Sequence, residues 1–152
     1  YAANWDEYEE TPFWPELDYI GIDAYFPLLQ DKDPSLEALK ASWEPHFKAV
    51  ENMALMCGKK VLFTEYGYRS VQYVGAKPWI IDRDQQPVNL EAQRRALQSI
   101  VNTFWPQDWF LGGFVWKWFM YLESAGGPKD NRFTPQNKPA ASVLAKAYAK
   151  YL

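Results

Sequence analysis

Cysteine and histidine are almost missing from this chain of 152 residues, which has one of each. The single cysteine, Cys57, excludes a disulfide within the chain and leaves the redox compartment open. It follows a helical pattern, which favours a small buried hydrophobic role. The single histidine, His46, argues against a metal site with several histidine ligands and against a histidine-based catalytic triad. We therefore expect neither a metal nor a cofactor.

Clusters of basic residues and long apolar runs are also missing. The formal net charge is -3, and the acidic residues are scattered along the chain. No apolar run approaches the roughly 20 residues that a membrane-spanning helix needs. The sequence therefore gives no indication of nucleic acid or a membrane as partner.

Aromatic residues are abundant: 8 Trp, 10 Tyr and 9 Phe make up 18% of the chain. Some of them must build the core, because a chain of this length forms a domain with a substantial interior. So many tryptophans also suit flat apolar ligands such as sugar rings. Composition alone favours the core explanation.

The hydrophobic pattern predicts alternating strands and helices. Period-two runs indicate strands over 1–5, 19–25, 61–65 and 112–119, and helical spacing indicates helices over 35–56, 89–104 and 140–151. Pro34 and Ser35 are expected helix-start signals, Asn89 an expected N-cap and Gly58 an expected helix end, and Pro45 should kink or split the first helix.

This alternation predicts an α/β fold with a parallel sheet and right-handed crossovers. Four strands with their helices amount to half of an eight-stranded (β/α)8 barrel, a TIM barrel, which takes about 250 residues. A doubly wound sheet is the alternative, disfavoured because no glycine-rich phosphate turn is present. We expect residues 1–152 to form one partial barrel domain.

The most informative segment is VLFTEYGYRS at 61–70. It places Glu65 at the end of a strand that is expected to be buried, and strict alternation would put it on the same face as Val61 and Phe63. A buried carboxylate is costly unless it is paired. Glu65 is therefore either a catalytic carboxylate at the barrel mouth or a structural residue salt-bridged to Arg69 or another cation.

Further candidates lie near the other strand ends, which converge on one mouth if the strands are parallel. Tyr25 could hydrogen-bond Glu65 or simply pack, and Asp23 is more readily a structural hydrogen-bond partner than a catalytic group. Trp116 and Trp118 could offer flat faces to a sugar or fill the core. Together these residues form a plausible sugar site.

The chain resembles the C-terminal half of clan-A retaining glycoside hydrolases, most closely the β-mannanases of glycoside hydrolase family 113. The resemblance rests on six ordered blocks: YAANWDEY (1–8), DYIGIDAYFPL (18–28), VLFTEYGYRS (61–70), the Pro78-Trp79 loop, GGFVWKWF (112–119) and FTPQNKPA (133–140). It implies that the four strands are strands five to eight of the barrel.

The resemblance also implies roles for individual residues. Glu65 matches the nucleophile, Tyr25 the tyrosine that supports it, and Trp116 or Trp118 the floor of a sugar subsite. We also assign Trp5, Asp23 and Trp79 to substrate binding, together with Trp116 and Trp118. The expected substrate is a β-linked oligo- or polysaccharide such as β-1,4-mannan.

One part of the family pattern is missing. The general acid/base of the family is a Glu that follows an Asn at the end of strand four, whereas this chain begins at what would be strand five. We therefore expect a fragment that carries the nucleophile and is inactive alone, with Asp23 as a conceivable substitute. Its open edges predict pairing with a missing N-terminal half barrel or with a second copy.

A different class of function remains open. The chain could be a non-catalytic half-barrel module that binds carbohydrate or protein through its aromatic face, with Glu65 structural. The compartment also stays open, although members of the family are often bacterial and extracellular.

Overall fold

The structure, a computed structural model, describes residues 1–81 and 87–151. Its strands are β1 (Ala3–Asn4), β2 (Tyr19–Asp23), β3 (Lys60–Tyr66) and β4 (Phe110–Val115). Its α-helices are α1 (Leu36–Ser42), α2 (Glu44–Cys57), α3 (Leu90–Phe104) and α4 (Ala140–Tyr151). Short 3-10 helices occur at η1 (Tyr8–Glu10), η2 (Trp14–Glu16) and η3 (Leu122–Ser124).

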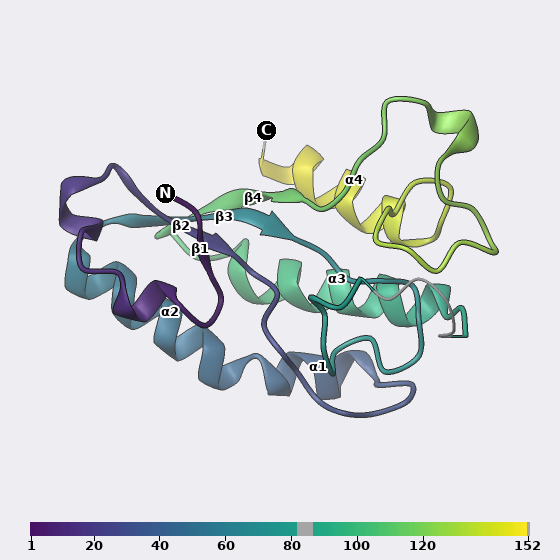
Figure 1. Cartoon of the computed structure of the whole chain (residues 1–152), viewed down its shortest axis with the longest axis horizontal. Coiled ribbons are helices and arrows are strands. Elements are labelled where there is room, and N and C mark those ends of the chain that lie inside the picture. Colours follow the sequence, from purple (N-terminus) through teal and green to yellow (C-terminus); the bar gives the residue numbers. More distant parts are fainter. Residues whose placement is uncertain (82–86, 152) are drawn as a thin grey trace.

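The four strands form one parallel sheet in the order β1-β2-β3-β4, as the alternating pattern predicts. Helices α1, α2 and α3 run along one side of this sheet, and α4 packs against α3 beyond β4 (Figure 1). Each connection between neighbouring parallel strands therefore returns the chain to the same end of the sheet. The carboxyl ends of all four strands consequently meet at one edge, where the candidate site residues lie.

The core lies between the sheet and the helices and is strongly aromatic. Ile22 and Phe63 are fully buried on the helix-facing side of the sheet. The Phe63 ring lies 4.8 Å from that of Phe104, which in turn lies 5.3 Å from that of Trp43. The indole of Trp43 donates a 3.0 Å hydrogen bond to Ser99 Oγ, so its buried polar atom is satisfied. Much of the aromatic content therefore builds the core.

The helix ends follow the predicted local signals. Ser35 Oγ accepts a hydrogen bond from the Ala38 N–H at 3.1 Å, and Asn89 Oδ1 accepts one from the Ala92 N–H at 2.9 Å. Gly58 ends α2 in the left-handed region with φ 61°. The expected interruption of the first long helix is also present, since α1 and α2 are separate helices.

Three strands are shorter than, or displaced from, the predicted ranges. The last one occupies Phe110–Val115 instead of 112–119, because its pairing with β3 stops at the Tyr66–Val115 pair. The strand predicted over 1–5 has only two residues, and the one predicted over 19–25 ends at Asp23. The period-two strand predicted over 112–119 therefore does not include Trp116 and Trp118, since both residues follow β4.

Cys57 is only half-buried, where a fully buried role was expected, although it packs against the core. It is the last residue of α2, and that position leaves its side chain partly open to solvent. Across residues 1–81 and 87–151, no helix combines the length and the apolar character that crossing a bilayer requires.

Tyr68 offers a test of the packing around the site. Its side chain is fully buried, and its hydroxyl has no hydrogen-bond partner among the described residues. We expect Tyr68→Phe to raise the free energy of unfolding by about 1–2 kcal/mol, because it removes an unsatisfied buried group. Burial also raises the pKa of Tyr68 well above 10.0. The folded chain therefore keeps a proton that the unfolded chain releases, and stability falls as pH rises past 10.

Urea unfolding at pH 7 and above pH 10 would test both parts of this prediction. The variant should be the more stable at pH 7 and should lose less stability than the wild type in alkali. Tyr66→Phe is the matched control, because the Tyr66 hydroxyl hydrogen-bonds that of Tyr148 at 3.1 Å and its removal should cost stability. Equal losses in the two variants at pH 7 would contradict the prediction.

Candidate active site

Glu65 reaches the site because β3 contains a bulge. Ile22 pairs with Phe63, but the next residue of β2, Asp23, pairs with Glu65, so that Thr64 is an extra residue in β3. A bulge of this kind reverses the alternation of side chains beyond it. Glu65 therefore shares a face with Asp23, and the expectation that it shares a face with Phe63 is wrong.

The Glu65 carboxylate is half-buried and hydrogen-bonded to a tyrosine. The Tyr25 hydroxyl donates to Glu65 Oε2 at 2.7 Å. Burial, together with this hydrogen bond to a carboxylate, raises the pKa of Tyr25 far above its usual value, so the hydroxyl keeps its proton. Among the described residues, the ion pairs do not include Glu65, and Arg69 Nε instead donates to the Asn131 carbonyl at 3.1 Å. Within residues 1–81 and 87–151, Glu65 therefore forms no salt bridge with Arg69 or with another cation.

Asp23 is held by a neighbour on the adjacent strand. Its Oδ1 accepts a 2.8 Å hydrogen bond from Thr64 Oγ1, the hydroxyl of the bulge residue. This contact joins β2 to β3 beside Glu65 and matches the structural role favoured for Asp23. Within the described ranges, no group of three or more His, Cys, Asp or Glu side chains could hold a metal ion.

Trp5 and Trp79 come together at the end of β1. Their rings stack with centroids 5.2 Å apart and planes inclined by 22°, and Trp5 also contacts the ring of Phe26 edge-on. Trp79 remains 41% exposed, so it presents part of its surface to solvent. The structure thus joins two of the candidate binding residues, which are far apart in the sequence, into one aromatic pair.

Trp116 and Trp118 lie in different places. Trp116 lines a cavity of about 240 Å³ together with Phe119 and Phe133. The Phe133 ring contacts the Tyr25 ring edge-on at 6.1 Å, which connects this cavity to the tyrosine that binds Glu65. Trp118 instead borders a separate cavity between β4 and α4. Only Trp116 is therefore linked by described contacts to the Glu65–Tyr25 pair.

A close backbone approach fixes Trp116 beside the end of β3. The Trp116 N–H donates to the Tyr66 carbonyl at 2.7 Å. A Cβ added to Gly67 would lie 2.2 Å from the Trp116 carbonyl oxygen, so only glycine fits at this point. Gly67, two residues after Glu65, therefore allows the ends of β3 and β4 to come this close.

Sequence reasoning missed two cationic residues of the site, Lys117 and Arg132, and considered Arg69 only as a salt-bridge partner of Glu65. All three line the same cavity as Trp116. Lys117 Nζ lies 4.5 Å from the Phe119 ring centroid and 5.6 Å from that of Trp116. The one available hint was the position of Lys117 between two tryptophans in GGFVWKWF. No local pattern indicated that Arg69 and Arg132, which are 63 positions apart in the numbering, line the same cavity.

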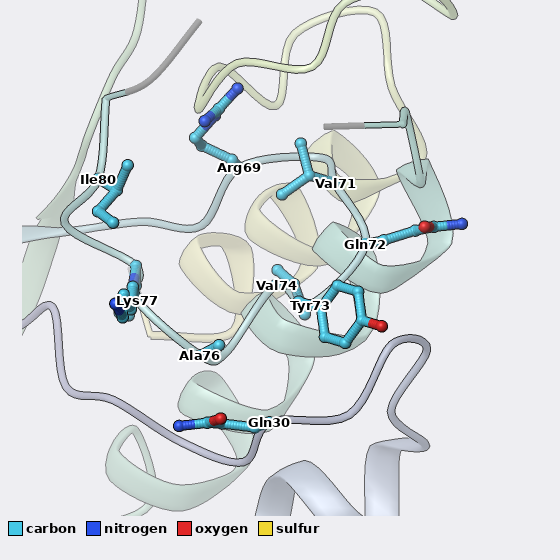
Figure 2. Close-up of a pocket in the computed structure, with 10 residues that line it drawn as sticks. Gln30, Arg69, Val71, Gln72, Tyr73, Val74, Ala76, Lys77 and Ile80 are labelled. Carbon is cyan, nitrogen blue, oxygen red and sulfur yellow. The ribbon is translucent and has the colours of Figure 1, made fainter. Parts of the chain in front are cut away.

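A second cavity, of about 170 Å³, lies under the loop that follows β3. Figure 2 shows Lys77, Ala76 and Ile80 along this loop, with Gln30 approaching from the connection between β2 and α1. Arg69 borders both cavities and extends away from Gln30 toward the loop that precedes α4 (Figure 2). Arg69 is thus shared by the linings of the two cavities.

Buried polar side chains hold the loop before α4 in place. Gln93 of α3 is fully buried, and its Nε2 donates to the carbonyls of Tyr68 and Phe133, both at 2.8 Å. Lys138 Nζ donates to Ser70 Oγ at 2.9 Å. Both side chains connect the segment after Glu65 to the loop that carries Phe133. The FTPQNKPA block (133–140) gave no indication of this contact of Lys138.

Comparison with known proteins gives a consistent result. The family model of Glycoside Hydrolase Family 113 matches residues 1–138. Among solved structures, the chain is similar to a family 113 β-mannanase from Alicyclobacillus acidocaldarius, in complex with ManMIm, with 26% identity and a TM-score of 0.81. The match covers all of this chain and 45% of that one. No curated protein matches the chain.

Two further solved structures, both described as family 113 β-1,4-mannanases, have the same fold. They are 21% and 20% identical to this chain with TM-scores of 0.80, and each match covers 98% of this chain and 44% of the other. The chain thus spans less than half the length of the structures it matches. The predicted half-barrel fold, a parallel four-stranded sheet with its helices, is confirmed.

Proposed function

The chain belongs to glycoside hydrolase family 113, and from this membership we propose that its mouth is part of the active site of a retaining β-mannanase. The observation that carries the proposal is the hydrogen bond from Tyr25 to Glu65 at the carboxyl end of the parallel sheet. Active sites of (β/α)8 enzymes lie at that end. A carboxylate with one oxygen held by a protonated tyrosine is suited to nucleophilic attack.

In the proposed reaction, Glu65 attacks the anomeric carbon of a β-linked sugar as the glycosidic bond breaks. The leaving oxygen takes a proton from a general acid, and a covalent glycosyl-enzyme forms. Water, deprotonated by the same group, then displaces Glu65 with overall retention. Tyr25 holds Oε2 and leaves Oε1 available for the attack.

A second carboxyl group about 5–5.5 Å from the nucleophile is needed for this chemistry. We propose that it comes from outside these residues, either from the rest of a barrel or from a partner chain, because Asp23 already accepts a hydrogen bond from Thr64. The surface on and after β4 supports such a partner. It exposes several large apolar side chains, namely Leu111, Phe114, Trp118, Met120 and Tyr121.

Within this proposal, Trp116 forms the floor of a sugar subsite next to Glu65, and the Trp5–Trp79 pair with Asp23 borders the site elsewhere. We expect Trp116→Ala to weaken binding of β-1,4-mannotetraose about tenfold, because an aromatic contact of this kind is worth about 1–2 kcal/mol. Trp118→Ala should change binding less than about twofold.

Titration calorimetry of both variants, with folding checked by circular dichroism, would measure the difference. The Trp118 variant is a matched control, since it removes the same side chain from the other cavity. Equal losses, or a larger loss for Trp118→Ala, would show that the sugar floor has been placed on the wrong tryptophan.

A binding module without catalysis is the second candidate, favoured by the exposed tryptophans. It predicts that glycan binding survives Glu65→Gln and that no hydrolysis appears when the rest of a family 113 barrel is supplied as a second polypeptide. Turnover of mannan oligosaccharides by the combined chains, abolished by Glu65→Gln, would exclude it.

A further inference from the structure

The cavity beside Trp116 has an unusual charge for this acidic chain. Its described lining consists of Arg69, Ile81, Trp116, Lys117, Phe119, Arg132, Phe133 and Thr134. Three of these residues are cationic and none is acidic, although the whole chain has a formal net charge of -3. Positive charge that lines a concave surface concentrates anions there.

Lys117 and Arg132 are exposed cations, and Lys117 Nζ lies over the rings of Phe119 and Trp116. Neither takes part in the ion pairs of the described residues. The acidic residue of the same loop, Asp130, is already engaged, because its Oδ1 accepts from Lys138 Nζ at 2.7 Å. Arg69 is anchored on the wall of the cavity by its bond to the Asn131 carbonyl. Asp130 therefore does not neutralise Lys117 or Arg132.

The cavity also lies next to the proposed reaction centre. Phe133 forms part of its wall and contacts Tyr25, whose hydroxyl binds Glu65. Trp116 and Phe119 supply flat apolar surfaces of the kind on which a pyranose ring packs. At about 240 Å³ the cavity is smaller than the roughly 300–1,000 Å³ typical of sites for drug-sized ligands, which suits one sugar unit.

We propose that this cavity binds an acidic sugar, a pyranose that carries a carboxylate, as a unit of the glycan. The aromatic side chains pack against the ring, and Lys117 and Arg132 bind the carboxylate through charge-assisted hydrogen bonds. This inference deepens the proposed function, on which it rests, by assigning uronic acid units to the substrate. A glycan made only of neutral sugars would offer Lys117 and Arg132 no anionic group to bind.

Titration of the full chain followed by NMR, with the tryptophan indole signals as reporters, tests the inference. Three probes separate the contributions: glucuronate, glucose as the neutral sugar, and acetate as the charge without the sugar. We expect glucuronate to bind at least about tenfold more tightly than either, because only glucuronate offers both the pyranose ring and the carboxylate that accepts charge-assisted hydrogen bonds. Equal affinity for glucuronate and glucose would overturn the inference.

Matched variants locate the binding. Lys117→Gln with Arg132→Gln should abolish the preference for glucuronate, and each single substitution should reduce it by severalfold. Lys129→Gln removes the same charge from an exposed position in the same loop and should leave the preference intact. A preference that persists in the double variant, or that Lys129→Gln removes equally, would contradict the proposal. Thermal unfolding checks the folding of all four variants in this series.

Failure of this inference is distinguishable from failure of the proposed function. Hydrolysis of neutral mannan by the combined half barrels, dependent on Glu65 and without any glucuronate preference in the chain, would remove only the acidic-sugar site. Glucuronate binding lost in the double variant, with no hydrolysis of any glycan, would keep the site and remove the hydrolase.

Discussion

Replacing Glu65 with Gln should reduce hydrolysis of β-1,4-mannan oligosaccharides by more than about 10⁴-fold when the chain is combined with the rest of a family 113 barrel. The substitution keeps the size of the side chain but removes the anionic oxygen that would attack the anomeric carbon. Tyr25 can still donate to the amide oxygen, so the local structure should persist. Glycan binding should therefore change little while turnover is lost.

The measurement is the release of reducing sugar by the combined chains, with thermal unfolding of each variant as a check on folding. Glu37→Gln is a matched control, because it makes the same chemical change at an exposed position on α1. It should retain full activity. Turnover by the Glu65 variant within about tenfold of the wild type would be incompatible with a nucleophilic role.

Chemical rescue separates a nucleophile from an acid/base. In Glu65→Ala, added azide can enter the space of the missing carboxylate, attack the anomeric carbon and yield the α-glycosyl azide, while the leaving oxygen still receives its proton. Loss of the acid/base instead would give the β-azide, because azide would then displace the intact nucleophile from the glycosyl-enzyme. A β product from the Glu65 variant would assign this residue the other role.

The sequence predicts those parts of the fold that depend on near neighbours. The N-cap at Asn89 and the glycine end of α2 at Gly58 each involve a few adjacent residues, and both are present as expected. The strand order follows from the same alternation, because short connections favour adjacent parallel strands. Interactions between residues that are near in the sequence therefore account for these helix ends and for the strand order of the half barrel.

The orientation of Glu65 could not be predicted in this way. The bulge at Thr64 depends on how β3 pairs with β2, and alternation alone puts the carboxylate on the helix-facing side. The separation of Trp116 from Trp118 has a similar cause, since β4 stops pairing at Val115. Both features depend on contacts between segments that lie far apart along the chain, which a period-two pattern does not contain.

Lys138 is the clearest case of a residue whose importance only the tertiary structure reveals. Its side chain is fully buried, and its Nζ donates to Asp130 Oδ1 at 2.7 Å and to the carbonyl of Arg132 and Ser70 Oγ, both at 2.9 Å. Burial lowers the pKa of Lys138, and Asp130 opposes this effect. The ammonium group thus joins the loop that carries Phe133 to the segment that follows Glu65.

Lys138→Ala should consequently lower the free energy of unfolding by about 3 kcal/mol, since removing one partner leaves the Asp130 carboxylate and two further acceptors without their donor. Urea unfolding at pH 7 measures the loss. Lys129→Ala, an exposed lysine of the same loop, should change stability by less than about 0.5 kcal/mol. A small effect of Lys138→Ala would mean that the loop is held chiefly by Gln93. In that case, Gln93→Ala should show the larger loss, because it would release the carbonyls of Tyr68 and Phe133 together.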